Sequence, residues 1–433
     1  MFRVIRMKLF QIPRDLVFAA IVGAGCLSAQ SQESQEVLPG ADVHTLLTIA
    51  MERNAEYAGM RFEAQAAAER VEPAGALPDP KFRTELRDIT KMGAQNATLW
   101  PSKVGSTRYV LMQDIPWFGK RDLKQQIAAF EAKSAQDKAR GTWSELAAKI
   151  KTAHAQRYYL HRNEKLTREI LDLVTRLEKV AQSRYAGGLA AQQDVIRAQI
   201  EQTNMNNELV VLASESRQVN ARLNALLARP ASAPLAEPET LRALPAPAQL
   251  DYAALEERVR SRNPVLFAEE SRIKAAEKNR DLTYKNRYPD FTVSLSPIQY
   301  QTAVKEWELM IELNIPLQQS SRRAQEREAE AMLSAARSRK DAAANQVLAE
   351  LSENLAGIEA ARGTGTLAAT RLLPQGELTF SSALAGYEAG KVDFATLLDA
   401  QRQIRQAKQN QIKAQLDAQM RLAEIEKLLG EDL

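Results

Sequence analysis

The side chains that most often carry chemistry in proteins are scarce in this chain of 433 residues. It contains three histidines (His44, His154 and His161) and a single cysteine, Cys26. His154 and His161 are seven residues apart and so share one face of a helix, but two histidines alone do not make a metal site. No glycine-rich loop suits a phosphate, and the carboxylates are spread as on a solvated coil. We therefore expect a protein that is not an enzyme and that has no metal site and no cofactor.

The first thirty residues are typical of an export signal. A positively charged start precedes an apolar segment, residues 16–25, that is too short to span a bilayer. We expect a signal peptide over residues 1–29, and its removal would leave nearly equal numbers of basic and acidic side chains. Nucleic acid is therefore not an expected partner. Cys26 either leaves with the signal or is the acceptor of a lipid anchor, because small residues precede it.

The chain contains an internal duplication of one unit. The stretch from Tyr185 to Leu227 recurs 202 residues later without a slip in register, and the segment that ends at Pro116 returns as the one that ends at Pro316. Two copies are too few for a capped solenoid, so the pattern favours a protomer that completes itself by assembly. The matched pairs are Tyr185 and Tyr387, Gly188 and Gly390, Val195 and Leu397, Ala198 and Ala400, Gln199 and Gln401, Leu226 and Leu428, and Leu227 and Leu429.

Each copy predicts the same order of elements. Residues 120–184 contain no proline, so they would form a helix of about 95 Å at 1.5 Å per residue, far longer than a globular core needs. In the second copy we expect Gly363, Gly365 and Pro374 to bend or interrupt the long helix. The first repeat, 41–228, has a helix over 41–71, strands near 81–89 and 106–115, and a helical hairpin over 120–228. A proline-rich connector or disordered linker follows over 229–250. The second repeat, 251–429, has a helix over 251–285, strands near 290–297 and 306–315, and a hairpin over 322–429.

The strands have one apolar and one polar face. From Glu306 to Ile315, apolar side chains alternate with Glu306, Glu308 and Glu312. This pattern fits either a soluble sheet covered by helices or a sheet in a membrane. The helices carry only the narrow apolar seam of a coiled coil, which favours the membrane. Four strands are too few to close a barrel, so that interpretation requires an oligomer.

These motifs, in this order, resemble the TolC family of outer-membrane efflux channels. The resemblance is carried by Asp114-Ile115-Pro116-Trp117-Phe118-Gly119-Lys120-Arg121 before a long helix, then by Tyr185-Ala186-Gly187-Gly188, Asp194-Val195 and Ala198-Gln199. The Pro-Trp-Phe-Gly-Lys-Arg run and Leu77-Pro78-Asp79-Pro80 are most similar to the heavy-metal and cation efflux branch. The second copy departs from the pattern, with Leu317-Gln318-Gln319 where the first has Trp-Phe-Gly.

The resemblance implies a mainly α-helical protein with a transmembrane β-barrel. Three copies would close one 12-stranded barrel in the outer membrane and one α-helical barrel across the periplasm. The expected partners are a periplasmic adaptor protein and an inner-membrane efflux pump. The adaptor would contact the two turns at Tyr185, Gly188, Tyr387 and Gly390, although helix capping alone would also account for the glycines. The polar strand face would line the barrel lumen with Glu306, Glu308, Glu312, Arg83, Arg87 and Arg108.

The resemblance also implies a periplasmic gate at Asp399. The acidic position that Asp399 matches lines the constriction in the family, and Arg197 is its counterpart 202 residues earlier. Three such carboxylates near one axis would bind cations or pair with bases. A cation-binding ring, a closing salt bridge to Arg197 and a merely exposed carboxylate all stay open.

Two other functions fit a long helical hairpin. A periplasmic adaptor resembles one hairpin flanked by glycine-rich β-modules, whereas here the hairpin is duplicated and those modules are missing. The other is a soluble coiled-coil scaffold without a pore, which would dissolve in buffer, whereas a barrel would need detergent for extraction. The sequence does not set the exported substrate.

Overall fold

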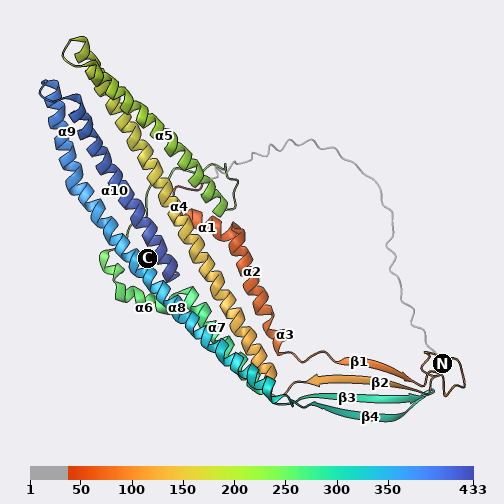
Figure 1. Ribbon diagram of the computed structural model, residues 1–433. Coiled ribbons are helices and arrows are strands. Elements are labelled where there is room, and N and C mark those ends of the chain that lie inside the picture. The colour runs from red at the N-terminus through yellow and green to blue at the C-terminus, as the bar shows by residue number, and fades with distance from the viewer. Residues whose placement is uncertain (1–37) are drawn as a thin grey trace, which may run out of the picture. The chain divides into compact units, whose positions relative to one another are not determined.

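The computed structural model describes residues 38–433, and Figure 1 shows how their helices and one sheet are arranged. The expected signal peptide and Cys26 lie outside these residues. The first half contains α1 (Val43–Arg53), α2 (Ala55–Glu69), α3 (Val71–Gly75), β1 (Lys81–Arg87), β2 (Ser106–Ile115), α4 (Lys120–Ala186) and α5 (Gln192–Leu226). The second contains the 3-10 turn Pro247–Leu250, α6 (Tyr252–Arg262), α7 (Pro264–Lys285), β3 (Asp290–Tyr300), β4 (Ala303–Asn314), α8 (Gln319–Leu367), a π-helical turn (Ala368–Leu372), α9 (Leu373–Glu388) and α10 (Phe394–Leu429).

The sheet is antiparallel in the order β1-β2-β3-β4, with two strands from each half of the chain. Among residues 38–433, no further strand pairs with the outer edge of β1 or of β4. The sequence prediction of the β3–β4 connection was wrong. Pro297, which ends the predicted strand, lies inside β3, and only Gln301 and Thr302 separate the two strands. The strand continues because Ile298 is buried and keeps the alternation, while the ladder shifts register next to the proline.

The helices form a layer built around α4. α4 packs against α5, α7 and α10, and α8 packs against α7 and α10. α2 also packs on α4, so α2 and α5 follow one another along this long helix, as do α7 and α10. The buried apolar side chains form separate clusters along the helices rather than one broad core, as narrow helical seams require.

The two helices predicted before the strands are each broken by an asparagine. Asn54 caps α2 by accepting from Tyr57 N, and its Nδ2 donates to Leu226 O at 2.9 Å. Asn263 caps α7 and donates in the same way to Leu428 O at 2.8 Å. Each asparagine therefore starts one helix and satisfies a carbonyl at the end of the returning helix. The expected unbroken helices over 41–71 and 251–285 were wrong at these positions.

The long helix of the second repeat begins at Gln319 and changes character before Pro374. α8 passes through Gly363 and Gly365 without interruption, and the π-helical turn lies at Ala368–Leu372. Proline lacks an N–H and its ring crowds the carbonyl four residues earlier, so a wider turn relieves the conflict. Of the three residues expected to disturb this helix, Pro374 is the one beside the disturbance.

The proline-rich connector is held against the helices by buried cations. The Arg157 guanidinium donates to Ala236 O at 2.7 Å and to Gly40 O at 3.1 Å, and burial lowers its pKa. The Arg242 side chain donates to Glu426 at 2.9 Å, and Lys151 reaches the same buried carboxylate at 2.7 Å. These bonds fix the segment in place, so the disordered-linker alternative was wrong.

Candidate functional site: the sheet faces and the hairpin turns

The strand register separates the sheet into two faces of opposite character. Phe82, Leu111, Leu295 and Leu309 lie side by side across β1, β2, β3 and β4. Their exposed fractions are 68, 54, 45 and 68%. On the opposite face Val110, Ser294, Ser296 and Ile298 are buried. Large apolar side chains are thus exposed across one whole face, whereas a water-soluble sheet covers its apolar face. The polar face is buried only near its centre.

The six residues expected in the lumen share the polar face, and four of them are exposed there. The register places Glu306, Glu308 and Glu312 on the same side as Arg83, Arg87 and Arg108. Two of the three arginines pair within their own strand. The Arg108 guanidinium lies 2.5 Å from Glu308, whereas Arg83 and Arg87 pair with Glu85 on their own strand, at 3.0 and 3.7 Å. One arginine, rather than three, therefore offsets the β4 carboxylates directly.

Aromatic side chains fix the junction between the sheet and the helices. Trp117 stacks on Tyr288 and on Phe291, with ring centroids 5.1 and 5.4 Å apart. Lys120 Nζ, at the first turn of α4, donates to Asp290 Oδ1 at 2.8 Å and to Tyr288 O at 3.0 Å. The start of α4 is consequently tied to the start of β3.

The two hairpin turns have the same backbone. Gly188 and Gly390 adopt left-handed φ angles of 70° and 71°. Leu189 N donates to Arg184 O at 2.8 Å, and Lys391 N donates to Gly386 O at the same distance. These bonds form the glycine-dependent Schellman cap of a helix C-terminus, which accounts for both glycines without a partner.

The side chains at the two turns differ. Tyr185 is 48% exposed, whereas Tyr387 is 3% exposed and packs on Phe394 with centroids 5.3 Å apart. Arg184 joins the turns, because its Nη1 donates to Glu388 O at 2.7 Å and its guanidinium lies over the Tyr387 ring. Burial raises the pKa of Tyr387, and nearby Asp194 raises it further.

The gate residues are not brought together within one chain. Asp399 has a side chain that is 67% exposed, and it pairs with Arg402 at 3.3 Å rather than with Arg197. Arg402 also reaches Glu201 of α5 at 2.6 Å, and Glu201 is buried. Arg405 pairs with Glu208 of α5 at 2.9 Å. Sequence reasoning missed these two bridges between the repeats, although each joins an arginine to a glutamate about 200 residues earlier, close to the repeat offset.

The two helical histidines have separate surroundings. His154 is buried with its Nε2 3.3 Å from Ala41 O, and desolvation lowers its pKa. His161 lies 4.0 Å from Glu237 and is more exposed. Within residues 38–433, no group of three metal-ligating side chains is positioned to hold a metal ion. In the same part of the chain, no helix is long and apolar enough to cross a membrane.

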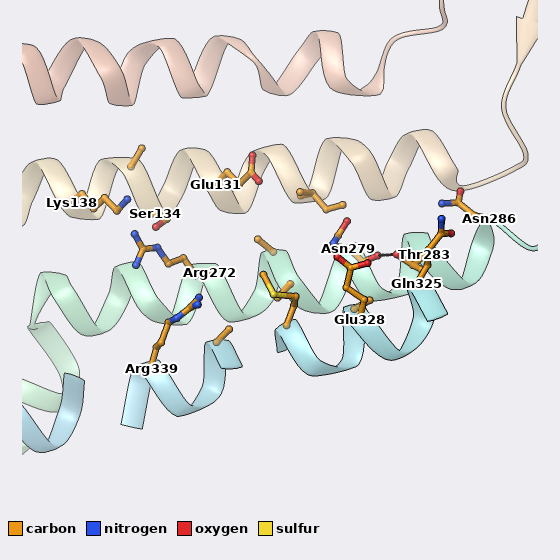
Figure 2. Close-up of a pocket in the computed structure, with 17 residues that line it drawn as sticks. Glu131, Ser134, Lys138, Arg272, Asn279, Thr283, Asn286, Gln325, Glu328 and Arg339 are labelled. Atoms are coloured by element: carbon orange, nitrogen blue, oxygen red, sulfur yellow. Dashed lines mark hydrogen bonds between the residues drawn. The ribbon is translucent and has the colours of Figure 1, made fainter. Parts of the chain in front are cut away.

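A groove of about 800 Å3 runs between α4, α7 and α8. Figure 2 shows side chains of both charges along it, among them Glu131, Lys138, Arg272, Glu328 and Arg339. Small residues such as Ala275 and Ala329 also line it. The mixed charges give the groove no evident preference for one kind of ion.

A sheet with an open apolar face, continued by long helical hairpins, defines the class of outer-membrane channels with a periplasmic helical part. Residues 255–431 match the family described as "Outer membrane efflux protein". The cobalt-zinc-cadmium resistance protein CzcC of Cupriavidus metallidurans is 26% identical over 372 residues, 81% of this chain and 82% of the relative.

Solved structures share the fold. CusC superposes with a TM-score of 0.78 at 16% identity, over 91% of this chain and 93% of that one. VceC of Vibrio cholerae superposes with a TM-score of 0.75 at 16% identity, over 90% and 96%. The family match over residues 255–431, the CzcC relative and the shared fold together support an outer-membrane efflux channel of the TolC type.

Proposed function

We propose that the protein works as a homotrimer that closes a 12-stranded β-barrel in the outer membrane and an α-helical barrel below it. The observation that carries this proposal is a four-stranded sheet with an exposed apolar face and two edges that no other strand of residues 38–433 pairs. In lipid, unpaired edge groups are costly, so β1 of one copy would pair with β4 of the next. The number of copies comes from the family.

In this assembly each protomer would consist of the two repeats, 41–228 and 251–429, and each repeat would contribute two strands and one helical hairpin. The open outer helices support the same assembly. α5 exposes Ile196, Ile200 and Val210, and α9 exposes Leu378. In the part of the chain that the structure describes, neither helix has a neighbour on its outer side. Apolar side chains on both flanks suit contact between copies arranged head to tail around an axis.

The experiment is the mass of the detergent-extracted protein by light scattering. We expect a trimer. Leu309→Arg should impair insertion by roughly 2–4 kcal/mol if the residue lies near the midplane, whereas Glu308→Gln on the polar face should leave assembly intact. A monomer under mild extraction, or equal tolerance of both changes, contradicts the proposal.

The partners are a periplasmic adaptor at the two turns and an inner-membrane pump. Tyr185 and Gly188 support an adaptor site because they are exposed, with open space beside Gly188. Tyr387 is buried and would act by holding the second turn rather than by contact. Replacement of Tyr185 by Ala should weaken cross-linking to the adaptor without changing trimer formation. Unchanged cross-linking would leave the first turn without a part in binding.

The gate would lie at Asp399. Its exposed carboxylate is available to a trimer axis, while Arg402 offsets part of its charge. Single-channel recording of Asp399→Ala separates the alternatives: loss of block by divalent cations supports a cation-binding ring, and raised conductance with unchanged block supports a closing salt bridge to Arg197 of a neighbouring copy. No change in either removes Asp399 from the gate. The name of the CzcC relative makes Co²⁺, Zn²⁺ and Cd²⁺ the first cargo to test.

A further inference from the structure

The loop between β1 and β2, residues 88–105, lies at the end of the sheet away from the helices, as Figure 1 shows. In an outer-membrane channel whose helices are periplasmic, this end is the outer one. The loop folds over the apolar face of the sheet. Thr107 shares that face with Leu111, is buried, and donates from its Oγ1 to Pro101 O at 3.1 Å. The residues beside Pro101 therefore adjoin the surface that would meet lipid.

Large apolar side chains of this loop are exposed. Leu99 and Trp100 are 77 and 65% exposed, and Met92 is exposed almost completely. Trp307, near the outer end of β4, is exposed on the same face as Leu309. Tryptophans at the edge of a lipid-facing sheet mark the level of the headgroups. Leu99 and Trp100 would then lie at the level of the headgroups of the outer leaflet.

The same loop carries a net positive charge. Lys91 and Lys103 are exposed, and no ion pair within residues 38–433 involves either of them. The one acidic residue of the loop is Asp88. Its two carboxylate oxygens accept from Met92 N at 2.8 and 2.9 Å. The two ammonium groups are thus free to bind an anion from outside the loop.

Hydrogen bonds hold the loop in a strained conformation. Asp88, Lys91 and Met92 have positive φ angles of 54°, 48° and 56°, which residues with a side chain rarely adopt. Asp88 O accepts from Lys91 N at 3.1 Å and from Gly105 N at 3.0 Å. Such strain persists where surrounding bonds fix it, and it is typical of functional segments. The loop is therefore a preformed surface.

We propose that this loop binds the phosphate-bearing headgroups of outer-leaflet lipids, with Lys91 and Lys103 on the phosphates and Leu99 and Trp100 inserted among the chains. The proposal rests on the lipid-facing sheet of the proposed function. Free lysines beside exposed tryptophan match an anionic membrane surface in charge and polarity. A neighbouring copy fits less well, because the acidic side chains of its β4 lie on the opposite, polar face.

The test uses the purified full chain, with any retained Cys26 replaced by serine, in phosphatidylcholine vesicles. A nitrobenzoxadiazole label on Leu99→Cys is quenched by lipids that carry a nitroxide near the headgroup. Nitroxide-labelled phosphatidic acid should be enriched at the label at least about fivefold over nitroxide-labelled phosphatidylcholine, the preference expected from one lysine near an anionic surface. Lys91→Gln combined with Lys103→Gln should bring this ratio close to one. Lys179→Gln, an exposed lysine of α4, is the control and should keep the wild-type ratio.

A second label, on Leu309→Cys, separates the loop from the barrel. Quenching at Leu309 with none at Leu99 overturns the loop proposal alone, and quenching at neither position overturns the barrel as well. An equal ratio in the wild type and the double lysine variant also overturns the proposal, since the lysines would then not bind the phosphates. A Leu99 label that neither lipid nor aqueous iodide quenches shows a loop packed on a neighbouring copy, which overturns it too.

Discussion

The two hairpin turns share a backbone and differ in what surrounds it. Gly188 and Gly390 have nearly equal φ angles and close the same hydrogen bonds. Yet Tyr185 is half exposed, while its counterpart Tyr387 is buried against Phe394. Duplication has kept the chain path, which glycine and the cap determine, while the side chains have diverged. The tyrosine of the first turn is therefore available to a partner, whereas the tyrosine of the second turn packs inside the hairpin.

The helices that lead to the turns diverge in the same sense. In the first hairpin the Glu178 carboxylate accepts from Gln199 and Gln202 at 2.9 and 2.6 Å, and these bonds lower its pKa. The positions 202 residues later that match Glu178 and Gln202 hold Phe380 and Ile404. Phe380 packs against the apolar cluster that contains Phe394. A polar network in one copy corresponds to apolar packing in the other.

The largest expected effect is on the packed turn. Phe394→Ala should lower the free energy of unfolding by about 3–5 kcal/mol, because a fully buried aromatic side chain would leave a cavity beside Tyr387. Gln192, its exposed counterpart in the first copy, is the control, and Gln192→Ala should change little. Denaturant titration measures both. Equal losses would mean that the two turns are packed alike.

A smaller effect is expected where the repeats are bridged. Arg402→Ala should cost about 1–3 kcal/mol, since it leaves the buried Glu201 carboxylate without its charged donor. Asp399→Asn removes only the exposed partner of the same arginine and should stay within about 0.5 kcal/mol. A double-mutant cycle between Arg402 and Glu201 isolates the pair. Additive losses in that cycle would show that the bridge contributes nothing.

The turn glycines test what the two copies share. Gly188→Ala and Gly390→Ala should each lower the thermal midpoint by a similar amount, equivalent to about 1 kcal/mol, because alanine resists the left-handed conformation. Gly187→Ala should be neutral or slightly stabilising, because Gly187 has a φ of −82° and its counterpart is already Ala389. Very different costs at the two glycines would break the backbone equivalence.

The smallest expected effect is a contrast in pH dependence. Burial raises the pKa of Asp194, so its contribution to stability is present at low pH and is lost as pH rises through the raised value. Hydrogen bonds from Thr396 lower the pKa of Asp393, so its contribution is lost as pH falls through the lowered value. Asp194→Asn and Asp393→Asn should therefore shift the thermal midpoint with opposite slopes between about pH 3 and 6. Slopes of the same sign would contradict the assigned surroundings.

Local patterns predicted much of the fold. Alternation located the strands and sorted their faces, since period two leaves little freedom in a strand. The positions of the two glycine turns were predicted from the repeat. The helix breaks at Asn54 and Asn263 were not predicted, because these side chains donate to carbonyls far away in the sequence, at Leu226 and Leu428. The two asparagines lie 209 residues apart, as do the helix caps Asp42 and Asp251, and this shared offset is the signal that could have revealed the breaks.

Pairwise contacts of the site were less predictable. Glu201 and Arg402 meet because α5 and α10 both pack on α4 and there come into contact with each other. Asp137 of α4 and Glu269 of α7 are buried where helices far apart in sequence pack together. Such features follow from packing, which a single sequence does not specify.

The central claim is that the apolar face of the sheet meets lipid. Its direct test is spin-label accessibility in reconstituted membranes, with single cysteines placed in turn at Glu308, Leu309, Met310 and Ile311 of β4 after any retained Cys26 is replaced by serine. The account predicts that labels at Leu309 and Ile311 are reached by oxygen dissolved in the bilayer, while those at Glu308 and Met310 are reached by a water-soluble nickel complex. Access of the nickel complex to all four positions would contradict it.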